Sequence, residues 1–591
     1  MPICKLTALR NLMSQRNISA YIIPSGDSHA SEYVADYFRS REWLSGFTGS
    51  AGLVVVTQTD AGLWTDGRYF AQAEQELQNS GITLYKSGEP DVPTYQAFLQ
   101  KLGQGIRVGF DGRVITISEF EKLKSALKST KATFMYNEDL VGQIWQNRPQ
   151  MPAQQAFAHE PPFATTPATQ KLSTIREKMR EKKITAYLVS ALDSVAWLLN
   201  IRGSDINSLP VAYAHALVTE TDAHVFIDPA KAQSLVASGH FSNFTLHPYD
   251  ALPKFLRTLK TQKLYYNPAR TNVLLAEAVP KAADASKYLK PHEDIIPLLK
   301  AVKTSDEISN IKNAFIKEGI VLVKMLKWLD DATKVGQPLT EGDVVRILQS
   351  LRAKQPHYLC DSFDTIAAYG KNAALAHYSP SEQGVALAAQ GFLLIDTGGQ
   401  YLDGTTDTTR TVCLGEITDE MRRDFTLVLK GHIGLARAVF PSGTVGSSLD
   451  ILARLPLWES GQNFRHGTGH GLGYCLSVHE GPQNIAPTWN AVALAPGMLL
   501  SNEPAIYKEN YGIRTENILL VTEQMKTNDG TFFAFETLTH CPIDTRAVLP
   551  ELLTQVERYW LNSYHTRTRE VLSPHLTDAE REWLRCATET I

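Results

Sequence analysis

The sequence is short of the features that mark secreted, membrane and nucleic-acid-binding proteins. Its six cysteines lie far apart with no C-x-x-C pair, so we expect reduced, mostly buried thiols rather than a disulfide framework. No apolar run approaches the ~20 residues of a membrane-spanning helix, and the start, Met1–Leu6, shows no secretory signal. No block of like charges occurs, and 58 basic against 62 acidic residues leave a net charge of −4. We therefore expect a cytoplasmic protein that binds neither membranes nor nucleic acid.

What the sequence does have is the composition of a long globular protein. Its 591 residues are 43% hydrophobic and 20% charged, without low-complexity tracts. At roughly 150 residues per domain, about four domains would fit. A proline-rich stretch, residues 149–170, is the strongest linker signal. Because proline fixes φ and lacks a donor, we expect this linker to be extended and exposed, and to follow a first domain at 1–148.

The segment after the linker repeats the pattern of the first domain. Three motifs recur in order, and the pairs are Ala20–Ile23 with Ala186–Val189, Trp43–Ser50 with Trp197–Ser204, and Gly62–Asp66 with Ala223–Asp228. Each copy reads as a helix, an apolar strand and further strands. The pattern predicts two related α/β domains, the second at 171–299.

A third domain, 300–591, is expected to begin with a long helix. Thr304 and Glu307 form a capping-box pattern, and apolar residues follow at helical spacing. An extension from about residue 550 carries Trp560, Leu572 and Trp583, which we expect to dock on the domain core. The residue types that carry chemistry are concentrated in this domain.

Two aspartates lie on strand-like runs of the third domain. Asp396 follows the apolar run Phe392–Ile395, and Asp407 stands in the Thr-rich run that comes next. Two adjacent antiparallel strands would bring both carboxylates to one point. Because an unpaired carboxylate is costly to bury, something positive is expected between them.

A glycine-rich segment, His466–Gly473, carries two histidines, His466 and His470. It lacks H-E-x-x-H, and glycine costs about 1 kcal/mol in a helix, so we expect a loop or an irregular strand. Leu472 takes the third glycine place of G-x-G-x-x-G, which argues against a dinucleotide site. Further candidate residues at strand edges or in turn-like stretches are His377, His479, Glu503, Arg514 and Glu516.

Taken singly, these residues have ordinary structural explanations, such as strand-end caps and surface ion pairs. Taken together, four carboxylates and one imidazole form a candidate metal site, namely Asp396, Asp407, His470, Glu503 and Glu516. Two divalent cations would neutralise the four charges, and oxygen-rich ligation with one histidine favours Mn²⁺, with Co²⁺, Fe²⁺ or Zn²⁺ as alternatives. Ions ~3.5–4 Å apart can share a water and polarise a carbonyl, so the set predicts hydrolytic chemistry.

Five segments resemble the aminopeptidase P branch of the pita-bread metallopeptidases, a group that includes methionine aminopeptidase, prolidase and creatinase. They are Trp43–Gly52, Leu63–Phe70, Asp396–Arg410, His466–His470 and Tyr559–His565. The resemblance covers essentially the whole chain. It implies a mixed α/β (α+β) protein in which two creatinase-like N-terminal domains precede a pita-bread catalytic domain.

The same resemblance implies roles for individual residues. Asp396 would chelate one ion, His470 and Glu503 the other, while Asp407, chosen over Asp403, and Glu516 would bridge them. A hydroxide between the two ions, most often Mn²⁺ in this family, would attack the first peptide bond, with Glu503 as general base. The remaining catalytic residues would be His377, His466 and His479 as donors to the oxyanion or the peptide, while Arg514 would orient Glu516.

The implied activity is removal of the N-terminal residue from peptides with proline in second place, by a homodimer. Prolidase, which cleaves only Xaa-Pro dipeptides, is the alternative within the enzyme class. A pita-bread module that binds peptides without catalysis is the alternative outside it. The sequence leaves open the preferred first residue, the physiological substrates, the metal used in the cell, the lining of the proline pocket and the oligomeric state.

Overall fold

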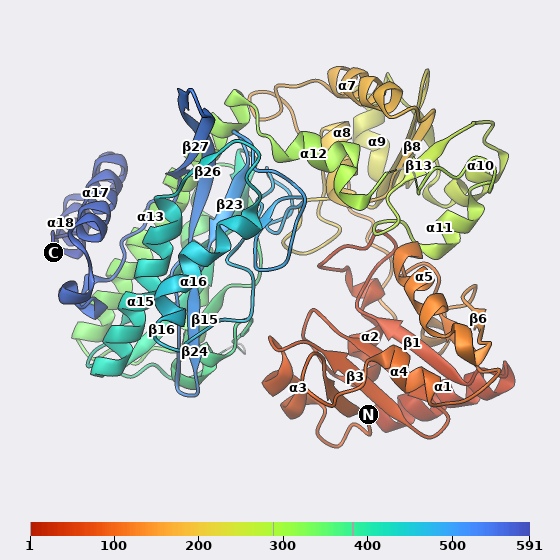
Figure 1. Cartoon of the computed structure of the whole chain (residues 1–591), viewed down its shortest axis with the longest axis horizontal. Coiled ribbons are helices and arrows are strands. Elements are labelled where there is room, and N and C mark those ends of the chain that lie inside the picture. Colours follow the sequence, from red (N-terminus) through yellow and green to blue (C-terminus); the bar gives the residue numbers. More distant parts are fainter. Residues whose placement is uncertain (1, 288, 381–382) are drawn as a thin grey trace. The chain divides into compact units, whose positions relative to one another are not determined.

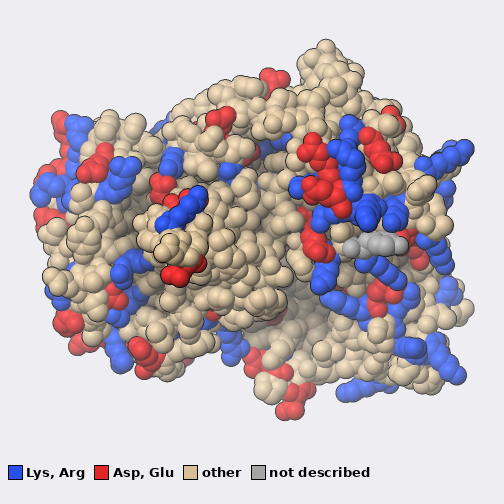
Figure 2. All heavy atoms as spheres, turned by 45° about the horizontal axis from the view of Figure 1, so that its top comes forward, with Lys and Arg blue, Asp and Glu red and all other residues tan. Residues whose placement is uncertain are grey.

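The computed structural model describes residues 2–287, 289–380 and 383–591, which form two compact units (Figure 1). One unit comprises residues 1–159, 166–207 and 211–296. The other comprises 160–165, 208–210 and 297–591 and holds every candidate site residue. No helix in the described part of the chain is both long and apolar enough to cross a membrane. On the face drawn in Figure 2, acidic and basic side chains are interspersed.

The first unit contains two sheets of matching topology. The first has the order β4-β3-β2-β1-β5-β6, with strands Thr83–Lys86, Ala61–Thr65, Leu53–Thr57, Ala20–Pro24, Arg107–Phe110 and Thr133–Met135. The second has the order β12-β11-β10-β8-β13, with strands Thr245–His247, Ala223–Ile227, Ala214–Thr219, Ala186–Val189 and Leu264–Tyr266. In both sheets three consecutive strands, β3-β2-β1 and β11-β10-β8, pair antiparallel, and the strands outside them join in parallel.

This shared topology confirms the predicted repeat of two related α/β domains. The recurring tryptophans also occupy equivalent places, because Trp43 lies on α2 (Ser40–Ser45) and Trp197 on α8 (Leu192–Leu199), each following the first strand of its sheet. The two copies therefore resemble each other in strand order, strand direction and motif position.

The proline-rich stretch is extended as predicted but is less exposed than we expected. Its strand β7 (Phe157–Ala158) pairs with β9 (Ile201–Arg202), and the flanking Ala156 and His159 are buried. The pairing satisfies backbone groups that a free linker would leave to water. Helix α7 (Ala168–Glu181) also begins before residue 170, the expected end of the linker.

Two of the sheets in the second unit are each covered by a pair of helices (Figure 1). Helices α13 (Ser305–Lys334) and α14 (Glu341–Arg352) pack on the sheet β15-β16-β19, whose strands are Ile366–Tyr369, Phe392–Thr397 and Thr408–Cys413. Helices α15 (Asp419–Ala436) and α16 (Asp450–Trp458) pack on β20-β27-β26-β23, whose strands are Val439–Pro441, Gly530–Thr537, Asn517–Thr527 and Leu499–Asn502. The capping box at Thr304 begins α13 as the sequence predicted.

Strand alternation separates the core of this unit from its site. On β16, Leu393 and Ile395 pack against α13 and α14, whereas Leu394 joins a cluster on the opposite face. Because side chains alternate along a strand, Asp396 shares the face of Leu394. The helices therefore cover one face of the sheet and leave the other for the carboxylates.

The end of the chain docks on the second unit, as the apolar residues there predicted. Helices α17 (Gln555–Leu572) and α18 (Asp578–Ala587) follow one another, and Leu561, Leu572 and Leu584 are fully buried. Leu572 and Leu584 pack against Val323 of α13. This extension is thus part of the core of the second unit.

Candidate metal centre

The two aspartates come from neighbouring antiparallel strands. Asp396 is the second-last residue of β16 and pairs with Thr409 of β19, while Asp407 directly precedes β19. Both carboxylates are buried. Asp403, the other acid of this run, instead pairs with Lys317 Nζ at 2.6 Å.

His470 is brought to the aspartates by the short strand β21 (Gly469–His470). Its backbone N donates to Ser501 Oγ at 2.9 Å, and its Nδ1 lies 2.9 Å from Gly471 O. A backbone partner at Nδ1 leaves Nε2 for the site. Nε2 lies 3.4 Å from Asp407 Oδ2 and 3.5 Å from Glu503 Oε1.

The two glutamates follow or precede strands of the second sheet. Glu503 comes directly after β23, and its backbone N donates to Thr468 O at 2.8 Å. Glu516 stands between β25 (Tyr511–Arg514) and β26, and it receives a 2.7 Å hydrogen bond from Thr409 Oγ1 on Oε2. The two glutamates are thereby tied to the segments that carry the histidine and the aspartates.

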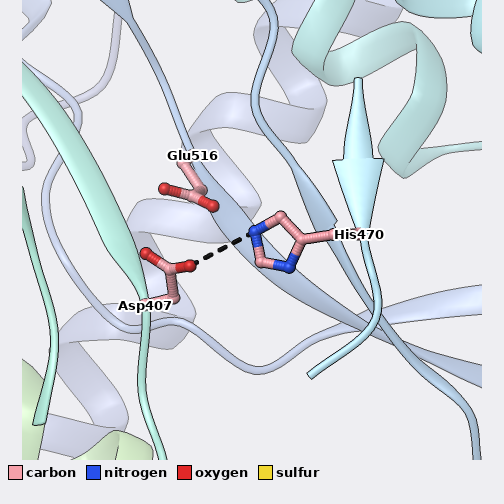
Figure 3. Close-up of side chains that lie close together, drawn as sticks. All are labelled: Asp407, His470 and Glu516. Carbon is pink, nitrogen blue, oxygen red and sulfur yellow. Dashed lines mark ion pairs between the residues drawn. The ribbon is translucent and has the colours of Figure 1, made fainter. Parts of the chain in front are cut away.

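The five predicted ligands gather in one place. Candidate ligand atoms of Asp407, His470 and Glu516 all lie within 4.8 Å of one another, and Figure 3 shows the three side chains pointing at a common centre. Glu503 borders the same imidazole, and Asp396 is close enough to Asp407 for the charge of Asp407 to raise its pKa. The structure thus brings together residues from the ends of five separate strands, β16, β19, β21, β23 and β26.

Burial makes this cluster of carboxylates prefer protons. Burial raises the pKa of Glu503 to about 6, with the charges of Asp407 and Asp396 adding to the shift. Burial, followed by the charges of Asp407, Glu503 and Asp396, raises the pKa of Glu516 well above its usual range. The pKa of Asp396 is also raised by burial, against the opposing charge of Arg514. Such shifts express a shortage of positive charge around these three acids.

The residues fit a divalent metal pair. Asp396 Oδ1 is buried and has no hydrogen-bond partner in the described part of the chain. A buried oxygen without a donor is costly, and a cation would satisfy it. Carboxylate oxygens with one imidazole are also the donor set that hard and borderline divalent ions prefer.

Hydrogen bonds run from Asp396 through Arg514 and Tyr507 to His466. Arg514 donates to Asp396 Oδ2 and, through NH1, to Tyr507 OH at 2.6 Å. Tyr507 OH lies 3.0 Å from His466 Nε2, and His466 Nδ1 lies 3.9 Å from Glu503 Oε2. We expected Arg514 to orient Glu516, but it holds Asp396 and reaches Glu516 only by way of Thr409, to which Nε donates at 3.2 Å.

Sequence reasoning missed Tyr507, which lies on β24 (Ala505–Lys508). A tyrosine on a half-buried strand is ordinary, so only its spacing from Glu503 could have drawn attention to it. Asp450 on α16 was also missed, although its Oδ1 accepts a 2.6 Å hydrogen bond from Thr468 Oγ1. Arg454, also on α16, donates to His466 O at 2.7 Å, so both residues fix the glycine-rich segment to this helix.

The other two predicted histidines are His479 and His377. The ring of His479 packs edge-on against that of His470, with centroids 4.3 Å apart.

His377 stands in a turn after residues 370–374. The next residue, Tyr378, packs on the cluster of Leu394, which shares a strand face with Asp396. Its hydroxyl donates to buried Glu341, which also accepts from Tyr369 N, Asn372 Nδ2 and Val385 N.

The parts of the chain that match known sequence families follow the arrangement of its sheets and helices. Residues 309–523 match metallopeptidase family M24, and 531–591 match the C-terminal region of peptidase M24. Residues 5–140 and 147–307 both match the creatinase/prolidase N-terminal domain. The fold and the site therefore define a pita-bread metallopeptidase that carries two creatinase-type domains.

Comparison with individual proteins narrows this class. The chain is 38% identical over 95% of its length to "Aminopeptidase P2" of Arabidopsis thaliana, covering 84% of that protein. It is 39% identical over 95% of its length to a "Probable Xaa-Pro aminopeptidase P" of Laccaria bicolor, covering 89% of it. A crystal structure from Caenorhabditis elegans, described as an X-prolyl aminopeptidase, "a cytosolic enzyme with a di-nuclear active site", matches all of both chains with a TM-score of 0.94 and 36% identity. The chain belongs to the aminopeptidase P family of M24 metallopeptidases.

Proposed function

We propose that the protein removes the N-terminal residue from peptides whose second residue is proline, with two divalent ions held by its carboxylate cluster. Membership of the aminopeptidase P family supports the reaction. The convergence of Asp407, His470 and Glu516, with Asp396 and Glu503 beside them, supports the metal pair. Asp396 would hold one ion, His470 and Glu503 the other, and Asp407 and Glu516 both.

When bound, the ion pair supplies a water of lowered pKa and polarises the carbonyl of the scissile bond. The chain's own residues then transfer protons and hold the peptide in place. Glu503 is proposed as the general base, because its carboxylate lies 3.5 Å from His470 Nε2 and so beside the place of the metal-held water. His377 and His479 are proposed as donors to the peptide or the oxyanion. His466, which lies between Tyr507 and Glu503, would keep the base in place.

The choice of metal and the compartment are proposals as well. Mn²⁺ suits four carboxylates and one imidazole, although other divalent ions share this preference. A cytoplasmic location agrees with the description of the solved nematode enzyme as cytosolic. We further propose three domains, at 1–148, 171–299 and 300–591, with the linker 149–170 between the first two.

A peptide panel on Mn²⁺-reconstituted protein tests the activity. Peptides with proline in second place should lose their first residue, and matched peptides with alanine there should remain intact. Cleavage of Arg-Pro-Pro separates this activity from prolidase, which would cleave only the dipeptide Arg-Pro. Failure to bind metal together with failure to cleave any peptide would support a binding module instead.

We propose that the protein is a homodimer, and one exposed apolar stripe supports self-association. On α16, Ile451, Leu455 and Trp458 are 38, 48 and 48% exposed, and their spacing places them on one helix face. Trp458→Glu should convert dimer to monomer in light scattering, whereas the exposed Trp489→Glu should not. A wild-type monomer at micromolar concentration would contradict the proposal.

A further inference from the structure

A buried ion pair lies behind the segment that joins the two aspartate ligands. Glu318 of α13 and Arg352 of α14 are 1 and 0% exposed. Arg352 Nε and NH2 donate to the Glu318 carboxylate at 2.7–3.1 Å, and NH1 pairs with Asp361 at 2.9 Å. Removing one member of such a pair is costly, but the pair itself adds little stability, so its retention invites another explanation.

This pair contacts the residues next to both aspartates. Arg352 NH2 donates to Thr397 Oγ1 at 2.6 Å, and Thr397 directly follows Asp396. Thr406 Oγ1 donates to Glu318 Oε2 at 3.3 Å, and Thr406 directly precedes Asp407. The Glu318–Arg352 pair thus holds the residue that follows Asp396 and the residue that precedes Asp407.

The segment between the aspartates has further contacts with the same pair. Tyr401 OH donates to Glu318 Oε2 at 2.9 Å, and Gly399 N donates to Thr406 Oγ1 at 2.8 Å. The backbone of Gly398 lies so close to that of Thr406 that a Cβ on residue 398 would stand 1.9 Å from Thr406 O. Residues 397–406 are therefore fixed at both ends and in the middle.

We propose that Glu318 and Arg352 are positioning residues that set the separation of Asp396 and Asp407, and thereby the affinity for the ion these two aspartates share. His470 and Glu503 come from β21 and the end of β23, outside this network. Loosening the network should therefore weaken one ion of the pair much more than the other. The inference rests on the proposed metal pair.

Thr397→Val tests this link with little change of shape, because it removes the hydroxyl that joins Arg352 to the Asp396 strand. We expect wild-type protein to bind two Mn²⁺ ions in calorimetric titration. Thr397→Val should keep one ion at near wild-type affinity and bind the other about 10–100-fold more weakly, the usual effect of losing a partner that supports a ligand. The electron paramagnetic resonance signal of a coupled Mn²⁺ pair should then give way to that of a single ion at limiting metal.

Two further variants separate positioning from general destabilisation. Thr397→Ser restores the hydroxyl and should recover both ions. Thr426→Val removes an equally buried threonine hydroxyl on α15, away from the ligands, and should bind both ions as wild type does. Two ions bound normally by Thr397→Val, or equal weakening of both, would overturn this inference alone, whereas wild-type protein that binds no metal would overturn the proposed site.

Discussion

Each carboxylate at the centre carries a charge that burial opposes. Arg514 offsets part of the charge at Asp396, while the Glu516 carboxylate accepts from the neutral hydroxyl of Thr409. The raised pKa values of Glu503 and Glu516 record the same shortage of positive charge. A bound cation pair would relieve all four acids at once, so the loss of one bridging acid should disturb the whole centre.

Asp407→Asn should abolish metal binding and hydrolysis together. The variant keeps the shape of the side chain but removes a charge from a proposed bridging position. Several kcal/mol of transition-state stabilisation would be lost, which corresponds to a decrease in kcat/KM of about a thousandfold or more. Metal content and peptide turnover measure the two effects, and the exposed Asp529→Asn serves as control. Normal turnover by Asp407→Asn would refute its assignment.

At the scale of elements, the ligands sit where strands end and glycines let chains approach. A Cβ on Gly469 would lie 1.9 Å from Ser501 O, so only glycine allows β21 to come this close to β23. A Cβ on Gly467 would meet its nearest atoms at 3.4 Å, which is ordinary contact. The glycines around His470 are therefore unequal in their importance.

Gly469→Ala should displace His470 and lower both metal affinity and kcat, whereas Gly467→Ala should be tolerated. The clash is with backbone, which cannot move without shifting the histidine or Glu503. We expect a loss of at least about tenfold in metal affinity for the first variant, as for other disturbed ligand supports. Equal effects of the two substitutions would contradict this account of the glycine-rich segment.

Two buried histidines make the second unit sensitive to acid. Burial, reinforced by the charge of Arg410, lowers the pKa of His432 on α15 and of His565 on α17 to about 3. An unfolded histidine titrates near 6.5, so below that pH the unfolded chain takes up protons that the folded chain refuses. Their contribution to stability is complete above pH 6.5 and is lost progressively as the pH falls toward 3.

His565→Gln should therefore reduce the fall in stability between pH 7.5 and pH 5. Each histidine accounts for about 2 kcal/mol of that fall at pH 5. Chemical unfolding at the two pH values gives the difference, which is insensitive to any constant effect of the substitution. The exposed His575→Gln should leave the pH dependence unchanged, and a similar response in both variants would argue against buried His565 as the source.

Sequence patterns predicted the elements better than the contacts between them. Capping at Thr304, the repeated strands and the strand-end acids are local features, so residues close in sequence are enough to predict them. Tyr507 and the ion pair of Glu318 with Arg352 could not be found this way. A glutamate inside a long helix usually faces solvent, and only the packing of α13 on α14 reveals that this one is buried.

At the scale of the whole molecule, every candidate ligand belongs to one of the two units. The creatinase-type unit contributes none of the five, although it supplies about half of the chain. Metal binding should therefore stabilise the second unit directly and the first unit only through any coupling between them.

Hydrogen–deuterium exchange with and without Mn²⁺ measures this distribution. We expect added protection in peptides that contain β16, β19, β23 and β26, and unchanged exchange in the sheets of residues 20–135 and 186–266. The comparison uses intact protein before and after treatment with a chelator. Protection spread evenly over both units would show that they respond to the metal as one body.

The order of the ligands along the chain also has a consequence for how the enzyme is made. Asp396 comes first and Glu516 last, and the segments between them must already have folded for the acids to meet. A polypeptide still emerging from the ribosome therefore lacks the complete set of candidate ligands until Glu516 has been synthesised. We expect peptidase activity only from chains that extend at least to this residue.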